Sequence, residues 1–187
     1  MLKAFLEQDP VKVAEQILGY HLVRQTPLGR IRLRITETEA YKGSEDPASH
    51  SYRGLTPRNQ LMFGDVGVVY VYFIYGMHFC MNIVSHREGE VGAILLRAAE
   101  VMEGYDIIRA NRPKAAERDL INGPAKLTQA LNINMGFNGY DLLQPTDELV
   151  LEKNNHNRSI IKTSRIGISK GQEFMWRFVL GKEQPNK

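Results

Sequence analysis

The stretch RIRLRITETEAY, residues 30–41, sets the pattern around which the rest of the chain is organised. In its first half Ile31, Leu33 and Ile35 alternate with arginine and threonine. Because successive side chains of a strand point to opposite faces, this alternation predicts a half-buried β-strand.

Two carboxylates stand near the end of this strand. If the alternation continues, Glu37, Glu39 and Tyr41 share the buried face, whereas a bulge after Ile35 would move them to the other one. A buried carboxylate costs free energy unless it is paired, hydrogen-bonded or placed in a polar cleft. Two interpretations stay open: an ion pair with an arginine such as Arg97, or a general base in a partly desolvated pocket.

Other elements are predicted on both sides of this strand. Asp9 and Pro10 form an N-cap followed by proline, and apolar residues then recur at helical spacing up to Gly19. Residues 42–60 read as a long polar loop of the kind that often carries function. Periodicity and turn residues predict strands over residues 68–74, 78–85, 93–98, 165–168 and 175–180, and helices over residues 100–110 and 124–131. The order of elements predicts one α+β domain over residues 1–187.

The composition is that of a globular protein, with 187 residues of which 43% are hydrophobic and 24% charged. The longest apolar run, residues 66–77, is broken by glycines and too short to span a bilayer. The first residues lack the pattern of a secretion signal. The single cysteine, Cys80, excludes an intramolecular disulfide and suits a reducing compartment, where it reads as a small core residue. We therefore expect a cytoplasmic protein that is neither secreted nor bound to a membrane.

Positive charge is concentrated in two places, although the net charge is only +3. Residues 150–187 contain eight basic and three acidic residues. A second basic set precedes the acidic half of the first strand: Arg24, Arg30, Arg32 and Arg34. Clustered cations suit a polyanionic partner, but an ordinary basic surface explains them equally well.

The hairpin predicted around Tyr75-Gly76-Met77 places an aromatic ring in a turn, where burial is hardest to arrange. Such a ring either folds back on its own hairpin or wedges between the bases of a duplex. A metal site built from His50, His78, His86, Cys80 and Glu39 is not expected, because their spacing matches no common zinc pattern.

A set of motifs, densest between Thr36 and Arg97, resembles the alkyladenine (3-methylpurine) DNA glycosylase family. The resemblance runs from about Asp9 to Leu180. Its motifs are Thr36-Glu-Thr-Glu-Ala-Tyr41, Ala48-Ser-His50, Thr56-Pro-Arg-Asn59, Met62-Phe63, Tyr70-Val-Tyr-Phe-Ile-Tyr-Gly-Met77, Phe79-Cys-Met-Asn82, Leu95-Leu-Arg97 and Gly123-Pro-Ala-Lys-Leu127.

The resemblance implies a role for each matching residue. Glu39 matches the catalytic acid that deprotonates the attacking water, and Arg97 the residue that helps to hold this water. Tyr41 and Tyr72 match the rings that sandwich the flipped base, and His50 closes the pocket from the side.

Further matches concern the choice of base and the grip on DNA. Asn82 matches the amide that crowds the exocyclic amino group of guanine. Tyr75 matches the intercalating tyrosine at the hairpin tip, with Met77 beside it. Met62 and Leu95 match apolar positions near the base and the minor groove.

The family resemblance also implies a curved antiparallel sheet with flanking helices and a protruding β-hairpin. The implied reaction is monofunctional hydrolysis that needs no metal and no organic cofactor, and the partner is double-stranded DNA containing damaged purines. We expect a monomer, and leave open whether deaminated and etheno purines are substrates besides alkylated ones. The alternative is a non-catalytic nucleic-acid-binding module on the same scaffold, which would have no need for Glu39.

Overall fold

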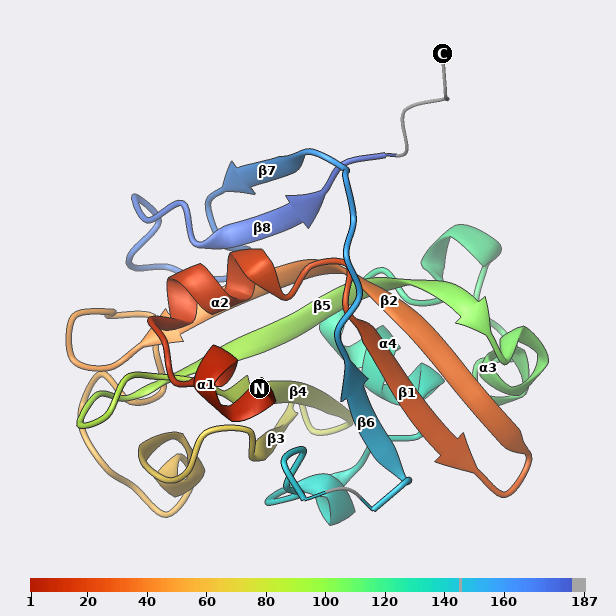
Figure 1. The fold of residues 1–187 in the computed structure, drawn as a ribbon, viewed down its shortest axis with the longest axis horizontal. Coiled ribbons are helices and arrows are strands. Elements are labelled where there is room, and N and C mark those ends of the chain that lie inside the picture. The colour runs from red at the N-terminus through yellow and green to blue at the C-terminus, as the bar shows by residue number, and fades with distance from the viewer. Residues whose placement is uncertain (145, 183–187) are drawn as a thin grey trace.

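The computed structural model describes residues 1–144 and 146–182. Its central strand is β2 (Gly29–Lys42), which pairs along most of its length with β5 (Gly92–Glu103). On its other edge β2 pairs first with β1 (His21–Thr26) and then with β8 (Arg177–Leu180). All of these pairings are antiparallel, so one long strand joins both halves of the sheet (Figure 1).

The remaining strands extend the sheet outward in the order β3-β4-β5-β2-β1-β6, with β7 attached through β8. They are β3 (Val69–Ile74), β4 (His78–Val84), β6 (Leu149–Glu152) and β7 (Ile160–Thr163). The helices are α1 (Leu2–Leu6), α2 (Pro10–Gln16), α3 (Tyr105–Asn111) and α4 (Pro124–Ala130), with short 3-10 turns at Gln60–Phe63, Glu117–Asp119 and Met135–Phe137. The predicted α+β class with a curved antiparallel sheet and flanking helices is confirmed.

The alternation predicted for β2 holds only up to Ile35. The register against β5 shifts on both sides of Glu37, which marks a bulge. Beyond it Thr38 points into the core, where its hydroxyl donates a 2.6 Å hydrogen bond to a carbonyl oxygen of α2. Of the two arrangements that the sequence leaves open, the structure therefore has the bulge after Ile35, which turns Glu37, Glu39 and Tyr41 to the opposite face.

Two predicted elements were also wrong. Residues 100–103 are not helical, because they extend β5 in register with β2, and the helix α3 begins only after Gly104. Residues 165–168 form no strand; the strand in this region is β7. The predicted helix after Asp9 is confirmed, with the Asp9 side chain accepting from the Val11 amide at 2.9 Å.

Folding brings acidic residues to both basic segments. Arg24, Arg30, Arg32 and Arg34 form ion pairs with Glu148, Glu103, Glu152 and Glu100, respectively. In the C-terminal segment the pairs are Arg158–Glu100, Lys162–Glu15, Arg165–Asp46 and Arg177–Glu37. Part of the positive charge is therefore neutralised within the fold; Glu183 and Lys187 lie outside the described residues.

Within the part of the chain that the structure describes, no helix meets the length and hydropathy needed to cross a membrane.

Candidate active site

A cavity of about 370 Å³ opens where β2, β4, β5 and the β3–β4 hairpin meet the loop after β2. Its volume lies in the range typical of small-molecule sites. Eight of the residues singled out in the sequence line it: Tyr41, His50, Met62, Tyr72, Tyr75, Asn82, Leu95 and Arg97.

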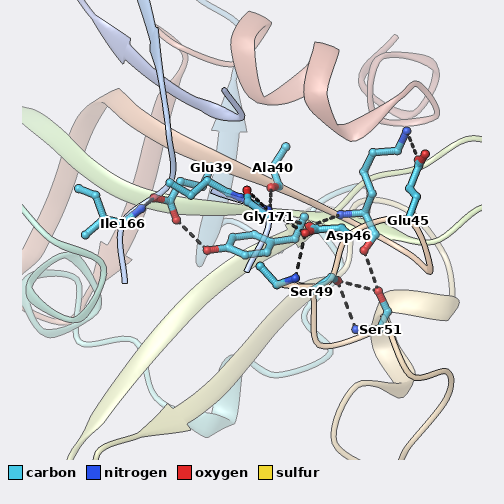
Figure 2. Close-up of polar contacts among 12 residues, drawn as sticks. Glu39, Ala40, Glu45, Asp46, Ser49, Ser51, Ile166 and Gly171 are labelled. Carbon is cyan, nitrogen blue, oxygen red and sulfur yellow. Dashed lines mark hydrogen bonds and ion pairs between the residues drawn. The ribbon is translucent and has the colours of Figure 1, made fainter. Parts of the chain in front are cut away.

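Glu39 lies directly behind the cavity wall and is fully buried. Its Oε2 accepts hydrogen bonds from the Tyr41 hydroxyl at 2.8 Å and from Nη1 of Arg97 at 3.2 Å. Its Oε1 accepts from the backbone N–H of Ile166 at 2.8 Å, as Figure 2 shows. All three donors belong to residues of the cavity wall. The ion pair with Arg97 is thus present, and the carboxylate also lies directly behind a cleft.

Arg97 joins Glu39 to the second carboxylate. Its Nε donates to Oε1 of Glu37 at 2.8 Å, and Nε of Arg177 donates to the same oxygen at 2.6 Å. Burial works to lower the pKa of Arg97, but the charges of Glu39 and Glu37 outweigh it and raise this pKa. Arg97 therefore remains a cation beside the cavity.

The aromatic walls are held by their own contacts. The rings of His50 and Tyr72 meet edge to face with centroids 4.6 Å apart, and Nδ1 of His50 lies 3.0 Å from the hydroxyl of Tyr70. Burial first and the charge of Arg58 second lower the pKa of His50 below its usual 6.5. Burial likewise raises the pKa of Tyr41 and Tyr72, to which the charge of Glu39 contributes. These walls are therefore uncharged at neutral pH.

Tyr75 lies at the tip of the β3–β4 hairpin with 86% of its surface exposed. Its φ of 52° falls in the left-handed region, which a bulky side chain rarely adopts, and Gly76 follows with a φ of 69°. Strain of this kind concentrates at functional positions. Met77 is exposed beside it but lines a separate depression next to α4.

The remaining predicted residues lie deeper. Asn82 is buried in the wall, where its amide nitrogen donates to the Tyr70 carbonyl at 3.0 Å. Met62 and Leu95 are buried side chains of the cavity wall, which agrees with a position near the base, while a contact with the minor groove stays a prediction. Cys80 is buried as predicted and also lines the cavity. No three His, Cys, Asp or Glu side chains gather as metal ligands within residues 1–144 and 146–182.

Sequence reasoning missed the segment after β7. Ile166, Gly167 and Ile168 line the cavity, and Arg165 immediately before them is buried. The alternation of Ile166 and Ile168 resembles a short strand in sequence, and no local pattern distinguishes it from a cavity wall. Pro124 at the start of α4 lines the cavity too, and it did lie within one of the family motifs.

A cavity with uncharged aromatic walls, next to an exposed ring on a hairpin, suits an enzyme that draws a single base out of a duplex. The DNA glycosylases are one class of such enzymes. The family model described as methylpurine-DNA glycosylase matches residues 4–184, and the chain belongs to this family.

Individual relatives agree along almost the whole chain. Three bear the name "Putative 3-methyladenine DNA glycosylase". The protein of Methanocella arvoryzae is 42% identical over 178 residues, covering 93% of this chain and 88% of the relative. That of Francisella tularensis is 43% identical over 182 residues, covering 96% and 94%. That of Carboxydothermus hydrogenoformans is 43% identical over 184 residues, covering 95% and 93%.

Proposed function

We propose that this protein, as a monomer with a single domain, removes 3-methyladenine and related alkylated purines from duplex DNA by hydrolysing their N-glycosidic bonds. The observation that carries the proposal is the position of Glu39, a buried carboxylate directly behind the wall of an aromatic cavity. Family membership and the names of the relatives support the class of substrate.

Glu39 is equipped to act on a water molecule. A carboxylate can accept about four hydrogen bonds, and Tyr41, Arg97 and Ile166 supply three. One acceptor position therefore remains for a water that enters from the cavity. As the glycosidic bond breaks, positive charge develops on the sugar. The carboxylate of Glu39 stabilises that charge and takes a proton from the attacking water.

The cavity walls suit a flat aromatic ligand. We place the extruded base between Tyr41 and Tyr72, with His50 at its edge and Asn82 facing its exocyclic group. A purine nucleotide alkylated at a ring nitrogen, as in 3-methyladenine, is cationic, and contact with each aromatic face contributes roughly 0.5–2 kcal/mol. A neutral His50 avoids the repulsion that an imidazolium would exert on such a base. The positive charge that the alkyl group brings to the purine makes the base a good leaving group, so the reaction needs little acid catalysis.

The hairpin tip supplies the wedge. Tyr75 lines the mouth of the same cavity while most of its ring is exposed. From this position it can fill the space that an extruded nucleotide leaves in the base stack. The alternative function, a nucleic-acid-binding module without activity, leaves the buried Glu39 and its three donors without a purpose.

The deciding experiment measures free bases released from methylated duplex DNA, and from duplexes that carry hypoxanthine or ethenoadenine. We expect release of 3-methyladenine, an intact abasic site and no covalent trapping by borohydride. If the protein binds lesion DNA yet releases no base, the alternative function, a nucleic-acid-binding module without activity, is correct. Release with borohydride trapping would instead replace the Glu39-activated water by an amine nucleophile.

A further inference from the structure

A buried ion pair lies behind the cavity. Nη1 and Nη2 of Arg165 donate to the two carboxylate oxygens of Asp46 at 2.6 and 2.7 Å, and both side chains are 0% exposed. Neither residue lines the cavity. Burying two ions costs free energy that apolar side chains of similar volume would not cost. A contribution to stability therefore does not explain why the chain has this buried pair.

The pair connects three segments of the cavity wall. Arg165 belongs to the segment after β7, and its Nη1 also donates to the carbonyl oxygen of Ala40 in β2 at 2.9 Å. Asp46 belongs to the loop after β2, where it accepts from the backbone N–H groups of Lys42 and Ala48, each at 3.1 Å (Figure 2). This loop carries His50 into the cavity wall.

Arg165 is also linked to two of the three hydrogen-bond donors of Glu39, one from a side chain and one from the backbone. The Arg165 guanidinium stacks on the ring of Tyr41, 4.7 Å from its centroid, and Tyr41 donates its hydroxyl to Glu39. One residue further, the N–H of Ile166 donates to the other oxygen of Glu39. Only the third donor, Arg97, comes from elsewhere in the sheet.

Close packing leaves little room for another arrangement. Gly171 lies against the pair with a φ of 67°, and a Cβ there would stand 3.0 Å from Nη2 of Arg165. The guanidinium also lies over the ring of Trp176, 5.2 Å from its centroid. The guanidinium is thus held by the bidentate pair with Asp46 and by its contacts with two aromatic rings.

We propose that Arg165 and Asp46 form a positioning pair, which holds Tyr41 and the Ile166 amide in the geometry that orients Glu39 in the glycosylase reaction. The inference rests on the proposed function, because it assigns the pair a role in that reaction. The chemical step is the sensitive quantity, since a displacement of about 1 Å in a reacting group can lower a rate about 100-fold.

The test compares Arg165→Lys with a matched control, Arg24→Lys. Arg24 is also a buried arginine, it pairs with Glu148 at 3.2 Å and it stacks 4.6 Å from the centroid of Phe137, but it lies on β1 and does not line the cavity. Lysine keeps the charge and loses both the bidentate pair and the flat stacking surface. The readouts are single-turnover release of 3-methyladenine from methylated duplex DNA, the affinity for lesion DNA, and the thermal midpoint.

We expect Arg165→Lys to lower the single-turnover rate constant about 10- to 100-fold with less than a threefold loss of affinity. Arg24→Lys should lose stability only. The fluorescence of Trp176, the single tryptophan of the chain, should shift in Arg165→Lys and not in Arg24→Lys.

Unchanged release by folded Arg165→Lys, or an equal loss in Arg24→Lys, overturns the proposal. Should Arg165→Lys not fold, Asp46→Asn decides in its place, because it removes one acceptor of the bidentate pair. If neither folds while Arg24→Lys does, the pair holds the whole fold and the positioning role is wrong. A parent protein that releases no base contradicts the proposed function instead, and the fluorescence comparison still reports on the pair.

Discussion

The backbone N–H of Ile166 donates a 2.8 Å hydrogen bond to Oε1 of Glu39, across 127 positions of the sequence. This bond places the segment after β7 against the carboxylate that β2 presents. Every residue except proline supplies a backbone N–H, so this donor orients Glu39 whatever other side chain stands at position 166. In the proposed reaction the orientation of Glu39 therefore depends on how this segment is held, and Arg165 ties it to Ala40 and Asp46.

Glu39→Gln should abolish base release while lesion DNA still binds. Glutamine keeps the size of the side chain, but it carries no charge to stabilise the cationic sugar and takes no proton from water. Rates of 3-methyladenine release and affinities for a lesion duplex, measured on the same preparation, check this expectation.

Glu37→Gln is the matched control for this carboxylate. Glu37 lies on the same strand as Glu39, where it contacts Arg97 and Arg177, but it does not line the cavity. We expect its release rate to fall by at most about tenfold, through a less well held Arg97, whereas Glu39→Gln loses release altogether. Release by Glu39→Gln at the rate of the parent would exclude Glu39 as the base.

Local patterns predicted the elements that hold the site, but not how its parts meet. The alternation before Ile35 and the Asp9-Pro10 cap were sufficient for β2 and α2. The sequence left a bulge after Ile35 open but could not decide it, because the shift is set by pairing with β5 and not by residues 30–41 alone. Eight of the ten residues assigned a role from the family motifs line the cavity, Glu39 lies behind its wall and Met77 lines a separate depression. The pair of Arg165 with Asp46 spans 119 positions and left no periodic signal.

Tyr75→Ala should weaken binding to lesion DNA by roughly 1–3 kcal/mol, the range for stacking of an aromatic side chain on a base. Binding to undamaged DNA should change less, because no gap is held open there. Phe73→Ala is the control: this ring is exposed on the same hairpin but lines a different depression. Titrations of both duplexes with each variant decide, and equal losses for the two DNAs would argue against a wedge.

Tyr75→Asn should stabilise the free protein while it weakens lesion binding. Residues 75 and 76 both have positive φ, the conformation in which hairpin turns favour Asn-Gly. Relief of the strained tyrosine should raise the free energy of unfolding by about 1 kcal/mol. Urea unfolding measures the gain. A loss of stability would mean that Tyr75 makes stabilising contacts that its exposure does not reveal.

Stability should fall in mild acid through His21. Burial first, and then the charges of Arg32 and Arg34, lower the pKa of His21 below its usual 6.5. The unfolded chain therefore binds a proton on this residue at a higher pH than the folded chain does. The free energy of unfolding accordingly decreases as the pH falls below about 6.5. In His21→Gln this decrease should be smaller, as denaturant titrations between pH 7.5 and about 5 can show; an unchanged pH dependence would assign it to other groups such as His50.

A last prediction separates backbone strain from lack of space. Gly104, where β5 gives way to α3, has a φ of 84°, and a Cβ there would stand 2.6 Å from the carbonyl oxygen of Arg30 and 2.8 Å from Cα of Ile31. Gly54 has a similar φ of 91° but nothing within 4 Å of an added Cβ. Gly54→Ala should therefore cost only the strain of the left-handed region, about 1–2 kcal/mol. Gly104→Ala must also displace backbone of the central strand, so it should cost clearly more, about 3 kcal/mol or above. Urea unfolding of the two variants measures the difference. Equal losses would mean that the backbone of β2 moves away at Arg30 without a cost in free energy. Since Arg30 lies at the far end of β2 from Glu39, folded Gly104→Ala should release base at the rate of the parent.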